Sequence, residues 1–241
     1  MSERCRLLAW DSAFFDRRIA RLEGDRLRAD EAGEILDWCA RERIDCLYFL
    51  ANAACPETTA IAQQSGFAFT DVRVTYARKS GDCGPGIDSR VTVRPHQTSD
   101  IPTLARIARA AHSDSRFFFD RHFDRNKVES LFESWIRKAC AEQHVLVGEL
   151  SGQPAGYLSC ERSADGTGSI GLVAVEAAMQ GRGVGLAMLR SALVWFESQG
   201  VTEVRVVTQG RNVPAHRLYQ RAGFLTQSVA FWFHRWFDPQ K

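Results

Sequence analysis

The stretch that decides the fold is Gln180-Gly181-Arg182-Gly183-Val184-Gly185, a loop with glycine at every second position. It lies between an apolar run typical of a strand, at 170–175, and an amphipathic pattern typical of a helix, at 186–199. The first N–H groups of a helix have no partner inside the helix, and the helix dipole favours negative charge beside them. Because glycine has no Cβ, a phosphate can approach such a backbone closely. The stretch therefore predicts a site for a phosphate or pyrophosphate group.

Two common phosphate loops do not fit this spacing. A P-loop ends in Gly-Lys-Ser/Thr, and no such tripeptide follows Gly185. A dinucleotide-binding loop spaces its glycines as G-x-G-x-x-G, and Leu186 stands where the third glycine is needed. What remains is the spacing Gln-x-x-Gly-x-Gly, formed by Gln180, Gly183 and Gly185. A glycine-rich turn without a ligand is the alternative, because glycine motifs alone are weak signals.

A second motif follows the predicted helix, Asn212-Val213-Pro214-Ala215-His216-Arg217-Leu218-Tyr219-Gln220-Arg221-Ala222-Gly223-Phe224. Pro214 suits the first turn of a helix and Gly223 suits its C-terminal cap. Val93-Arg94-Pro95, ahead of Asp100-Ile101-Pro102, opens this part of the chain. With the glycine loop, these motifs resemble those of the GNAT acetyltransferases, over about residues 90–241. The resemblance implies an α/β GNAT fold, with a mixed, mostly antiparallel sheet flanked by helices.

The beginning of the chain repeats part of its end. With a shift of 157 positions, Leu36-Asp37-Trp38 falls on Leu193-Val194-Trp195, and Gln63-x-x-Gly66-Phe67 falls on Gln220-x-x-Gly223-Phe224 without a gap. Both regions read helix, strand, helix, Gly-Phe, strand. An ungapped register of this kind favours a degenerate repeat.

The repeat predicts how the chain is divided. The stretch 81–89 is rich in glycine and polar residues and separates the two patterned regions. We predict a degenerate, partial GNAT-like domain at 1–80, a linker at 81–89, and a complete GNAT catalytic domain that binds acetyl-CoA at 90–241. The first unit has Cys55 and Ala62 at the positions of Asn212 and Tyr219. It also has no glycine loop, so we expect it to lack the cofactor chemistry and to serve as packing surface or as a wall of the acceptor site.

A closer resemblance involves the whole chain. It rests on Leu8-Ala9-Trp10-Asp11-Ser12-Ala13-Phe14-Phe15, Ser115-Arg116-Phe117, Ile170-Gly171-Leu172-Val173-Ala174-Val175 and Thr208-Gln209. These stretches resemble the dTDP-fucosamine acetyltransferases, which acetylate dTDP-4-amino-4,6-dideoxygalactose for a cell-surface polysaccharide. The resemblance implies an N-acetyltransferase that moves acetyl from acetyl-CoA to the amine of a nucleotide-linked amino sugar. The alternatives are another amine, on a protein N-terminus, a polyamine or an aminoglycoside, and a CoA-binding module without turnover.

The same resemblance implies the residues that hold the cofactor. The backbone of the loop would bind the CoA pyrophosphate, and Arg182 could add charge; its members are Gln180, Gly181, Arg182, Gly183, Val184 and Gly185. In the family, the strand before the loop separates from its neighbour. Val173 and Val175 would then pair with the pantetheine, and a backbone N–H at Leu172 or Val173 would polarise the thioester carbonyl.

The residues for chemistry are fewer. Tyr219 is the candidate general acid for the departing CoA thiolate; a phenol near pKa 10 that protonates a thiolate near 8.5 does so uphill by about 2 kcal/mol. Asn212 would hydrogen-bond the cofactor, or cap its helix. Glu161 could accept the amine proton and Arg116 could bind a nucleotide diphosphate, although an exposed carboxylate and a surface arginine are the plain alternatives. The sequence identifies no firm general base.

The composition of the chain limits which classes of molecule it is expected to bind. The 31 Lys+Arg against 29 Asp+Glu give a net charge of +2, which argues against a nucleic-acid partner. No secretory signal and no membrane helix are expected, so we predict a cytoplasmic enzyme with small-molecule substrates. Seven scattered cysteines suit a reducing compartment and indicate no metal site. The C-terminal aromatic run, residues 231–237, alternates as a strand would, and its outer face could serve a homodimer.

Overall fold

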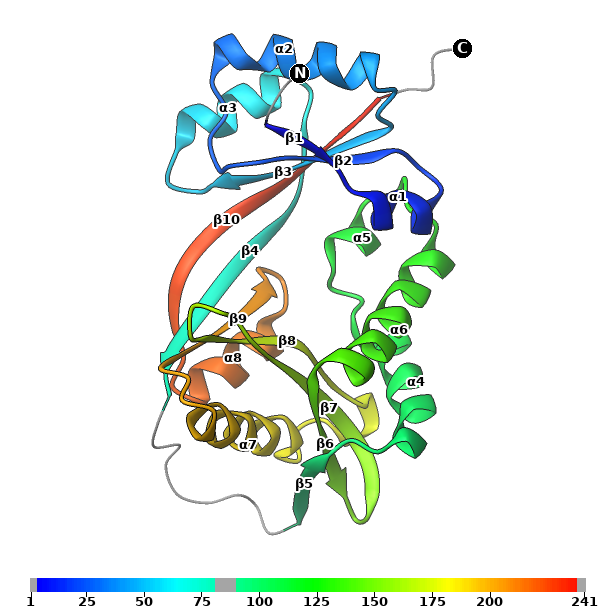
Figure 1. Ribbon diagram of the computed structural model, residues 1–241, viewed down its shortest axis with the longest axis vertical. Helices are drawn as coiled ribbons and strands as arrows, with labels where there is room; N and C mark the ends of the chain where they lie inside the picture. Colours follow the sequence, from blue (N-terminus) through cyan, green and yellow to red (C-terminus); the bar gives the residue numbers. More distant parts are fainter. Residues whose placement is uncertain (1–3, 81–89, 238–241) are drawn as a thin grey trace.

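The computed structural model describes residues 4–80 and 90–237, and in these the strands form one sheet in the order β1-β2-β3-β10-β4-β9-β8-β7-β6-β5 (Figure 1). The strands are β1 (Cys5–Leu7), β2 (Ile19–Leu22), β3 (Cys46–Asn52), β4 (Ala68–Lys79), β5 (Val91–Pro95), β6 (His144–Leu150), β7 (Gln153–Arg162), β8 (Thr167–Val175), β9 (Glu203–Gln209) and β10 (Leu225–Trp236). The β2–β3 and β8–β9 pairs are parallel and the others are antiparallel. The predicted mixed, mostly antiparallel α/β architecture is confirmed.

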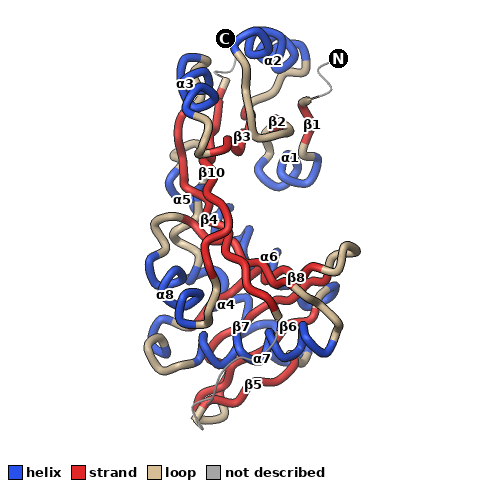
Figure 2. The backbone as a smooth tube through the Cα atoms, turned by 90° about the vertical axis from the view of Figure 1, so that its left-hand side faces the viewer, coloured by secondary structure: helices blue, strands red, loops and turns tan. Residues whose placement is uncertain are grey.

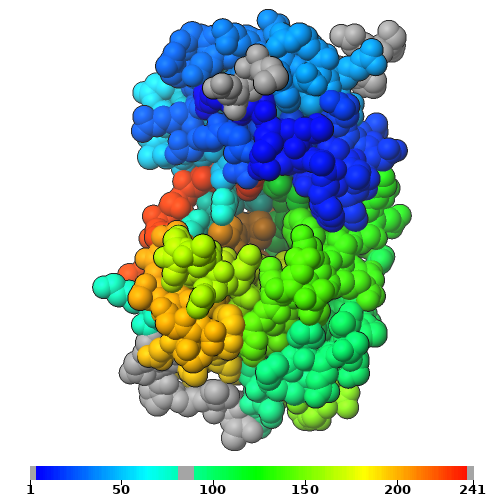
Figure 3. Space-filling model, in the orientation of Figure 1, coloured from blue at the N-terminus to red at the C-terminus, as the bar shows by residue number. Residues whose placement is uncertain are grey.

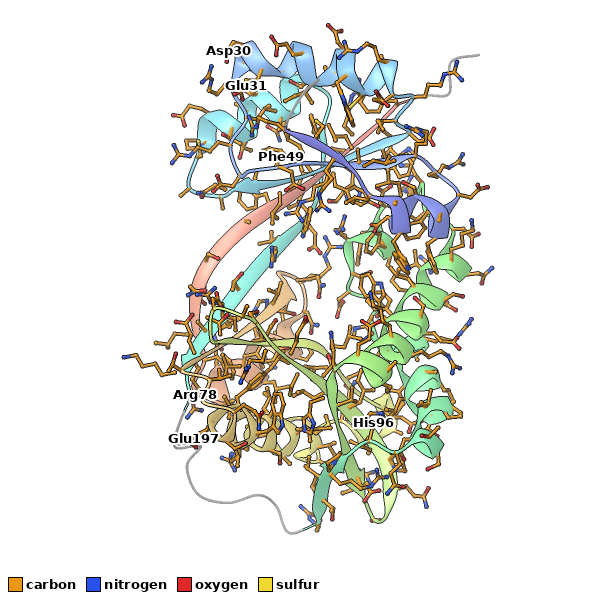
Figure 4. All side chains as sticks on the ribbon, viewed as in Figure 1. Asp30, Glu31, Phe49, Arg78, His96 and Glu197 are labelled. Atoms are coloured by element: carbon orange, nitrogen blue, oxygen red, sulfur yellow. The ribbon has the colours of Figure 1, made fainter. Side chains whose placement is uncertain are left out.

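Helices cover both faces of this sheet. They are α1 (Ala9–Phe15), α2 (Ala29–Arg41), α3 (Pro56–Gln64), α4 (Ile101–Ala111), α5 (Arg116–Phe119), α6 (Arg125–Glu142), α7 (Val184–Ser198) and α8 (Val213–Arg221), with short 3-10 turns η1 (Thr98–Asp100) and η2 (Ala177–Met179). One buried cluster packs α7 and α8 on the C-terminal strands, and a second packs α2 and α3 on β2, β3 and β10. A third joins α4, α5 and α6 to Phe15 and Tyr48 of the N-terminal part. Phe49 lies in the second cluster, beneath α2 and α3 (Figure 4).

The internal repeat is visible in the element bounds. β3, α3 and β4 correspond to β9, α8 and β10 with the same shift of 157 at both ends of each element. β2 pairs with β3 in parallel, as β8 pairs with β9. The described elements therefore show the same order and spacing twice. The division into a partial and a complete domain stays a prediction, and the proposed linker 81–89 lies outside the described residues.

The two units exchange their last strands, which the sequence does not predict. β4 pairs with β9 of the C-terminal unit, whereas β10 crosses to pair with β3 of the N-terminal unit. The registers are equivalent, because Arg73↔Gln209 becomes Ala230↔Asn52 when each residue is moved by 157. β4 and β10 pair with each other along most of their length and run together from one unit to the other (Figure 2). Arg73 opposes Ala230, its own repeat equivalent, so a pseudo-twofold axis passes between them.

Each exchanged strand also caps a helix of the other unit. Gly66 and Gly223 follow α3 and α8 with positive φ angles of 77° and 79°, as helix C-termini often require. Arg78 of β4 donates to the carbonyl of Ala222 at the end of α8 (Figure 4), and Arg235 of β10 donates to the carbonyl of Gly66 at 3.3 Å. These reciprocal contacts fix the exchanged strands against both units. No helix among the described residues is long and apolar enough to cross a membrane.

Candidate active site

A fork between two strands lies at the centre of the C-terminal unit. β8 pairs with β9 only from Thr167 to Ile170, opposite Glu203 to Val206. Beyond that point β8 stays on β7, while β9 stays on β4. Within the described residues, the edge of β8 from Gly171 to Val175 is therefore not paired with a neighbouring strand on the fork side. This is the separation that the resemblance implies for the acetyl-CoA strand.

Hydrogen bonds show which backbone groups face the fork. The N–H of Leu172 donates to Ser159 Oγ at 2.9 Å, and the N–H of Glu176 donates to the carbonyl of Ala155 at 2.8 Å. Both partners belong to β7, and successive residues of a strand direct their N–H groups to opposite edges. The N–H groups of Val173 and Val175 therefore face the fork, whereas that of Leu172 is directed toward β7.

The glycine loop joins this strand to α7. η2 and Gln180 follow β8, and α7 begins at Val184 with Gly183 as its N-cap. Gly181 and Gly183 have positive φ angles of 74° and 85°, which residues with a Cβ rarely adopt. Gly185 lies close to α8 instead, since a Cβ there would lie 3.1 Å from Leu218 Cδ2, which would have to shift by a few tenths of an ångström. The loop thus exposes the first N–H groups of a helix and lets α8 pack closely on α7.

The other loop residues differ in their contacts. The side chain of Gln180 donates to the carbonyl of Val175 at 3.2 Å, which links the loop to the open edge of β8. Arg182 is exposed. The backbone of the loop and the edge of β8 form one continuous surface of N–H and carbonyl groups, a donor set that fits a pyrophosphate and an amide-containing chain.

Tyr219 is buried in α8, next to the residue that contacts Gly185. It is 4% exposed, and burial raises the pKa of its hydroxyl above the usual value of 10. Its ring centroid lies 5.8 Å from that of Tyr76 and 6.1 Å from that of Phe224. Asn212 is the N-cap of the same helix and accepts from the N–H of Ala215 at 3.1 Å. In the structure Asn212 therefore caps its helix through its side-chain oxygen. The nitrogen of its side-chain amide takes no part in this hydrogen bond.

A cavity of about 180 Å³ lies between the two units, beside the exchanged strands β4 and β10. Its walls come from β4, β9, β10, α6 and the segment around α5; the lining residues are Asp71, Val72, Arg73, Ser115, Arg116, Phe117, Phe132, Trp135, Val207, Thr208, Gln209 and Trp232. Figure 3 shows a hollow in this region, between the blue N-terminal part and the green part of the chain. Val207 to Gln209 follow Val206, the last residue of β9 that pairs with β8. The cavity therefore adjoins the fork.

Arg116 is fixed in the wall of this cavity. Its guanidinium lies over the rings of Tyr48, Phe117 and Trp232, with Cζ 4.4, 4.2 and 4.1 Å from the centroids. Its Nη1 donates to His234 Nε2 at 2.7 Å. Burial lowers the pKa of Arg116, while the aromatic faces favour its charge. Arg116 is therefore a cation held in place rather than a mobile surface arginine.

A buried network holds Arg116 in this orientation. Because His234 Nε2 accepts from Arg116, its Nδ1 carries the proton and donates to Asp120 Oδ2 at 2.6 Å. Burial lowers the pKa of His234 to about 4, which keeps the ring neutral. Burial alone would raise the pKa of Asp120, but hydrogen bonds from His234 and Trp236 hold it below the usual range. Sequence reasoning gave no role to His234 or Asp120, because nothing in the local pattern indicates that they meet.

Asp71 is the acidic group of the cavity, and sequence reasoning missed it. It is 1% exposed, and burial raises the pKa of its carboxyl to about 6, against the opposing charge of Arg211. The alternation Thr70-Asp71-Val72-Arg73-Val74 is typical of a strand with one solvated face; here that face lines the cavity instead.

Glu161, the other acidic candidate, has different surroundings. It opposes Ser169 on β8, in the segment that still pairs with β9, and it is exposed. Its carboxylate accepts from Gln143 at 3.3 Å. The structure does not place it among the residues that line the cavity. Within 4–80 and 90–237, no three His, Cys, Asp or Glu side chains gather as a metal site.

Comparisons with known proteins agree with this geometry. The sequence model of the Acetyltransferase (GNAT) family matches residues 106–224. The dTDP-fucosamine acetyltransferase of Escherichia coli O6:H1 is 29% identical over 234 residues, which are 95% of this chain and 96% of that protein. The spore coat polysaccharide biosynthesis protein SpsD of Bacillus subtilis is 28% identical over 144 residues, 59% of this chain and 50% of that protein.

Solved structures show the same fold. A GCN5-related N-acetyltransferase from Sphaerobacter thermophilus superposes with a TM-score of 0.71 at 19% identity, over 98% of this chain and 77% of that one. A tandem GNAT protein from the clavulanic acid biosynthesis pathway superposes with a TM-score of 0.61 at 12% identity, over 92% of this chain and 76% of that one. The strand fork, the glycine loop and the family match lead to one conclusion: this chain contains an acetyltransferase domain of the GNAT family.

Proposed function

We propose that this enzyme transfers acetyl from acetyl-CoA to the amine of a nucleotide-linked amino sugar of the dTDP-4-amino-4,6-dideoxygalactose type. The observation that carries the proposal is the position of Arg116. Its guanidinium is held against aromatic rings in the wall of a cavity beside the fork. A fixed guanidinium suits a diphosphate, which it can bind with two hydrogen bonds. Arg73 lines the same cavity and adds a second positive charge. The likeness to a dTDP-fucosamine acetyltransferase over nearly the whole chain supports the same acceptor class.

We assign the donor side to the fork and the loop. The N–H groups at the start of α7 would bind the CoA pyrophosphate, and the fork edge of β8 would pair with the pantetheine. Of the two candidates for the thioester, the N–H of Val173 faces the fork and that of Leu172 is bonded to Ser159. Val173 is therefore the residue we propose to stabilise the developing oxyanion.

Tyr219 is our proposed general acid. An ordinary tyrosine with a pKa near 10 would protonate a thiolate with a pKa near 8.5 at some cost in free energy. The raised pKa of Tyr219 makes this transfer more costly. The proton would therefore move as the C–S bond breaks, when the sulfur is most basic. We keep the cytoplasm as the proposed location, since scattered cysteines suit a reducing compartment.

A CoA-release screen tests the proposal. Purified protein and acetyl-CoA are offered dTDP- and UDP-linked amino sugars, the matching free amino sugars, polyamines, aminoglycosides and peptides. We expect turnover with a nucleotide-linked amino sugar. Efficient turnover with peptides or polyamines alone would point to the second candidate, an acetyltransferase for another amine. Acetyl-CoA that stabilises the protein without any turnover would leave only the CoA-binding module.

A substitution at Arg116 tests whether this residue binds the diphosphate of the acceptor. Arg116→Lys should raise the KM of the nucleotide-linked sugar by about tenfold or more, since one bidentate contact is lost. The KM of the corresponding free amino sugar should hardly change. Arg109→Met is the matched control, because Arg109 is bound to Glu129 and Glu133 on the outside of α6. An equal loss for both sugars would remove the diphosphate role from Arg116.

A further inference from the structure

The wall of the cavity contains a buried carboxylate with one oxygen that lacks a partner. Asp71 Oδ1 accepts from the N–H of Val72 at 2.8 Å and lies 3.6 Å from Arg211 Nη2. Within the described residues, Oδ2 is buried and accepts no hydrogen bond. Ser115 Oγ, in the same cavity wall, also lacks a hydrogen-bond partner in the described part of the chain. Buried unpaired polar atoms are costly, so two of them in one cavity indicate a ligand that brings hydrogen-bond donors.

Arg211 does not supply the missing donor. Its guanidinium lies over the ring of Phe119, with Cζ 3.6 Å from the centroid, and its Nη2 donates to the carbonyl of Thr70 at 2.9 Å. These contacts hold it on the Oδ1 side of Asp71. The charges that act on Asp71 are those of Arg211 and Arg116, which favour its ionised form, and that of Asp114, which opposes it. Among the described residues, Arg211 Nη1 is likewise buried without a hydrogen-bond partner, so this guanidinium does not bond Oδ2, and Oδ2 can accept from a ligand.

The repeat shows that this carboxylate is particular to one unit. The position equivalent to Asp71 on β10 is Ser228, which is exposed. The pseudo-twofold axis would place a second carboxylate symmetrically, and the chain has none there. The exchanged β4 therefore carries a charged group of the N-terminal unit into the cavity that adjoins the fork of the C-terminal unit.

We infer that Asp71 binds the acceptor's ammonium group through Oδ2 and takes its proton, so that the N-terminal unit supplies the general base. This inference rests on the proposed transfer of acetyl to an amine. The first proton of the ammonium moves to Asp71, and the nitrogen lone pair forms the bond to the thioester carbon. The C–S bond breaks, and the thiolate takes the proton of Tyr219. The second proton leaves the nitrogen and restores Tyr219, and Asp71 releases the first proton to solvent when the product leaves. The pKa of about 6 for Asp71 suits a base that works near neutrality.

Asp71→Asn tests the inference, because asparagine keeps the shape and the Oδ1 acceptor for Val72. It is assayed with whichever amine the wild-type protein turns over fastest, so that a wrong choice of sugar does not decide the outcome. We expect kcat/KM for the acceptor to fall about 100-fold or more, while the affinity for acetyl-CoA stays within about twofold. The wild-type kcat/KM should decline below about pH 6, and the variant should lose this limb.

Controls separate a base from a structural group. Asp114→Asn removes a nearby charge of the same sign and should keep kcat/KM within about threefold. Asp71→Glu should recover part of the rate, since it restores a carboxylate in a slightly different place. A kcat/KM for Asp71→Asn within about threefold of wild type, or an unchanged acid limb, overturns the inference and leaves the proposed function intact. A wild-type protein that acetylates no amine overturns both.

Discussion

Asp71 should lower the stability of the fold, and the size of this effect follows from its burial. The side chain is 1% exposed, and its carboxyl has a pKa of about 6, compared with about 3.9 in an unfolded chain. A raised pKa means that the folded state favours the protonated form. Below about pH 3.9 the protonated carboxyl therefore does not reduce the stability of the fold. As the pH rises through about 6, its ionisation lowers the free energy of unfolding. At pH 8 the ionised carboxylate costs up to about 3 kcal/mol, from two pKa units at about 1.4 kcal/mol each.

Replacing the carboxylate by an amide should remove this cost. Asp71→Asn is expected to raise the free energy of unfolding by up to about 3 kcal/mol at pH 8, and by about half as much at pH 5. Urea unfolding at the two pH values, followed by circular dichroism, gives the midpoints and their slopes. The exposed Asp37→Asn on α2 is the control and should change stability by less than about 0.5 kcal/mol at either pH.

The result that would refute the reasoning is a loss of stability on Asp71→Asn, or a gain that does not depend on pH. A loss would mean that the carboxylate is satisfied in the folded protein by partners that the amide cannot replace. The expected gain, together with loss of turnover, would identify a group that is retained for chemistry at the expense of stability.

Three further predictions concern residues described above. Tyr219→Phe should lower kcat by about 100-fold and leave acetyl-CoA affinity unchanged, measured by CoA release and calorimetry; an unchanged kcat would exclude Tyr219 as the general acid. Gly185→Ala should destabilise the protein by about 1–3 kcal/mol, because its Cβ meets Leu218 at 3.1 Å, and the cost should shrink in a Leu218→Ala background. Additive effects there would contradict the contact. Arg78→Ala should cost about 1–3 kcal/mol in urea unfolding and Arg235→Ala less, because the bond from Arg235 is 3.3 Å long and exposed; the reverse order would contradict the caps.

The sequence predicts the elements around the fork well, because each has its own local signal. Gly181 and Gly183 mark a turn that needs positive φ, and Pro214 and Gly223 mark the two ends of α8. The repeat register of 157 is also a property of the sequence alone, and the element bounds reproduce it.

The strand exchange and the cavity have no comparable signal in the local sequence. β4 and β10 alternate in the same way and follow equivalent helices, so either can pair with β3 or with β9 without breaking its pattern. The contacts of Arg116 with His234, and of His234 with Asp120, join residues 118 and 114 positions apart. Glu161 was the natural acidic candidate because it lies near the cofactor strand in the sequence, whereas Asp71 comes from the other unit. The oligomeric state and the roles of the individual site residues stay predictions.

The exchange of β4 and β10 also decides the order in which this protein can fold during synthesis. β4 is made early, yet its two neighbours in the sheet, β9 and β10, are more than a hundred residues further along the chain. Likewise, β3 receives its second neighbour only when β10 leaves the ribosome. Such distant pairings are slow to form, and the strands that await them have open edges. The N-terminal unit therefore cannot complete its part of the sheet alone, and synthesis of β10, rather than completion of the first unit, should start the final assembly of the sheet and of the cavity.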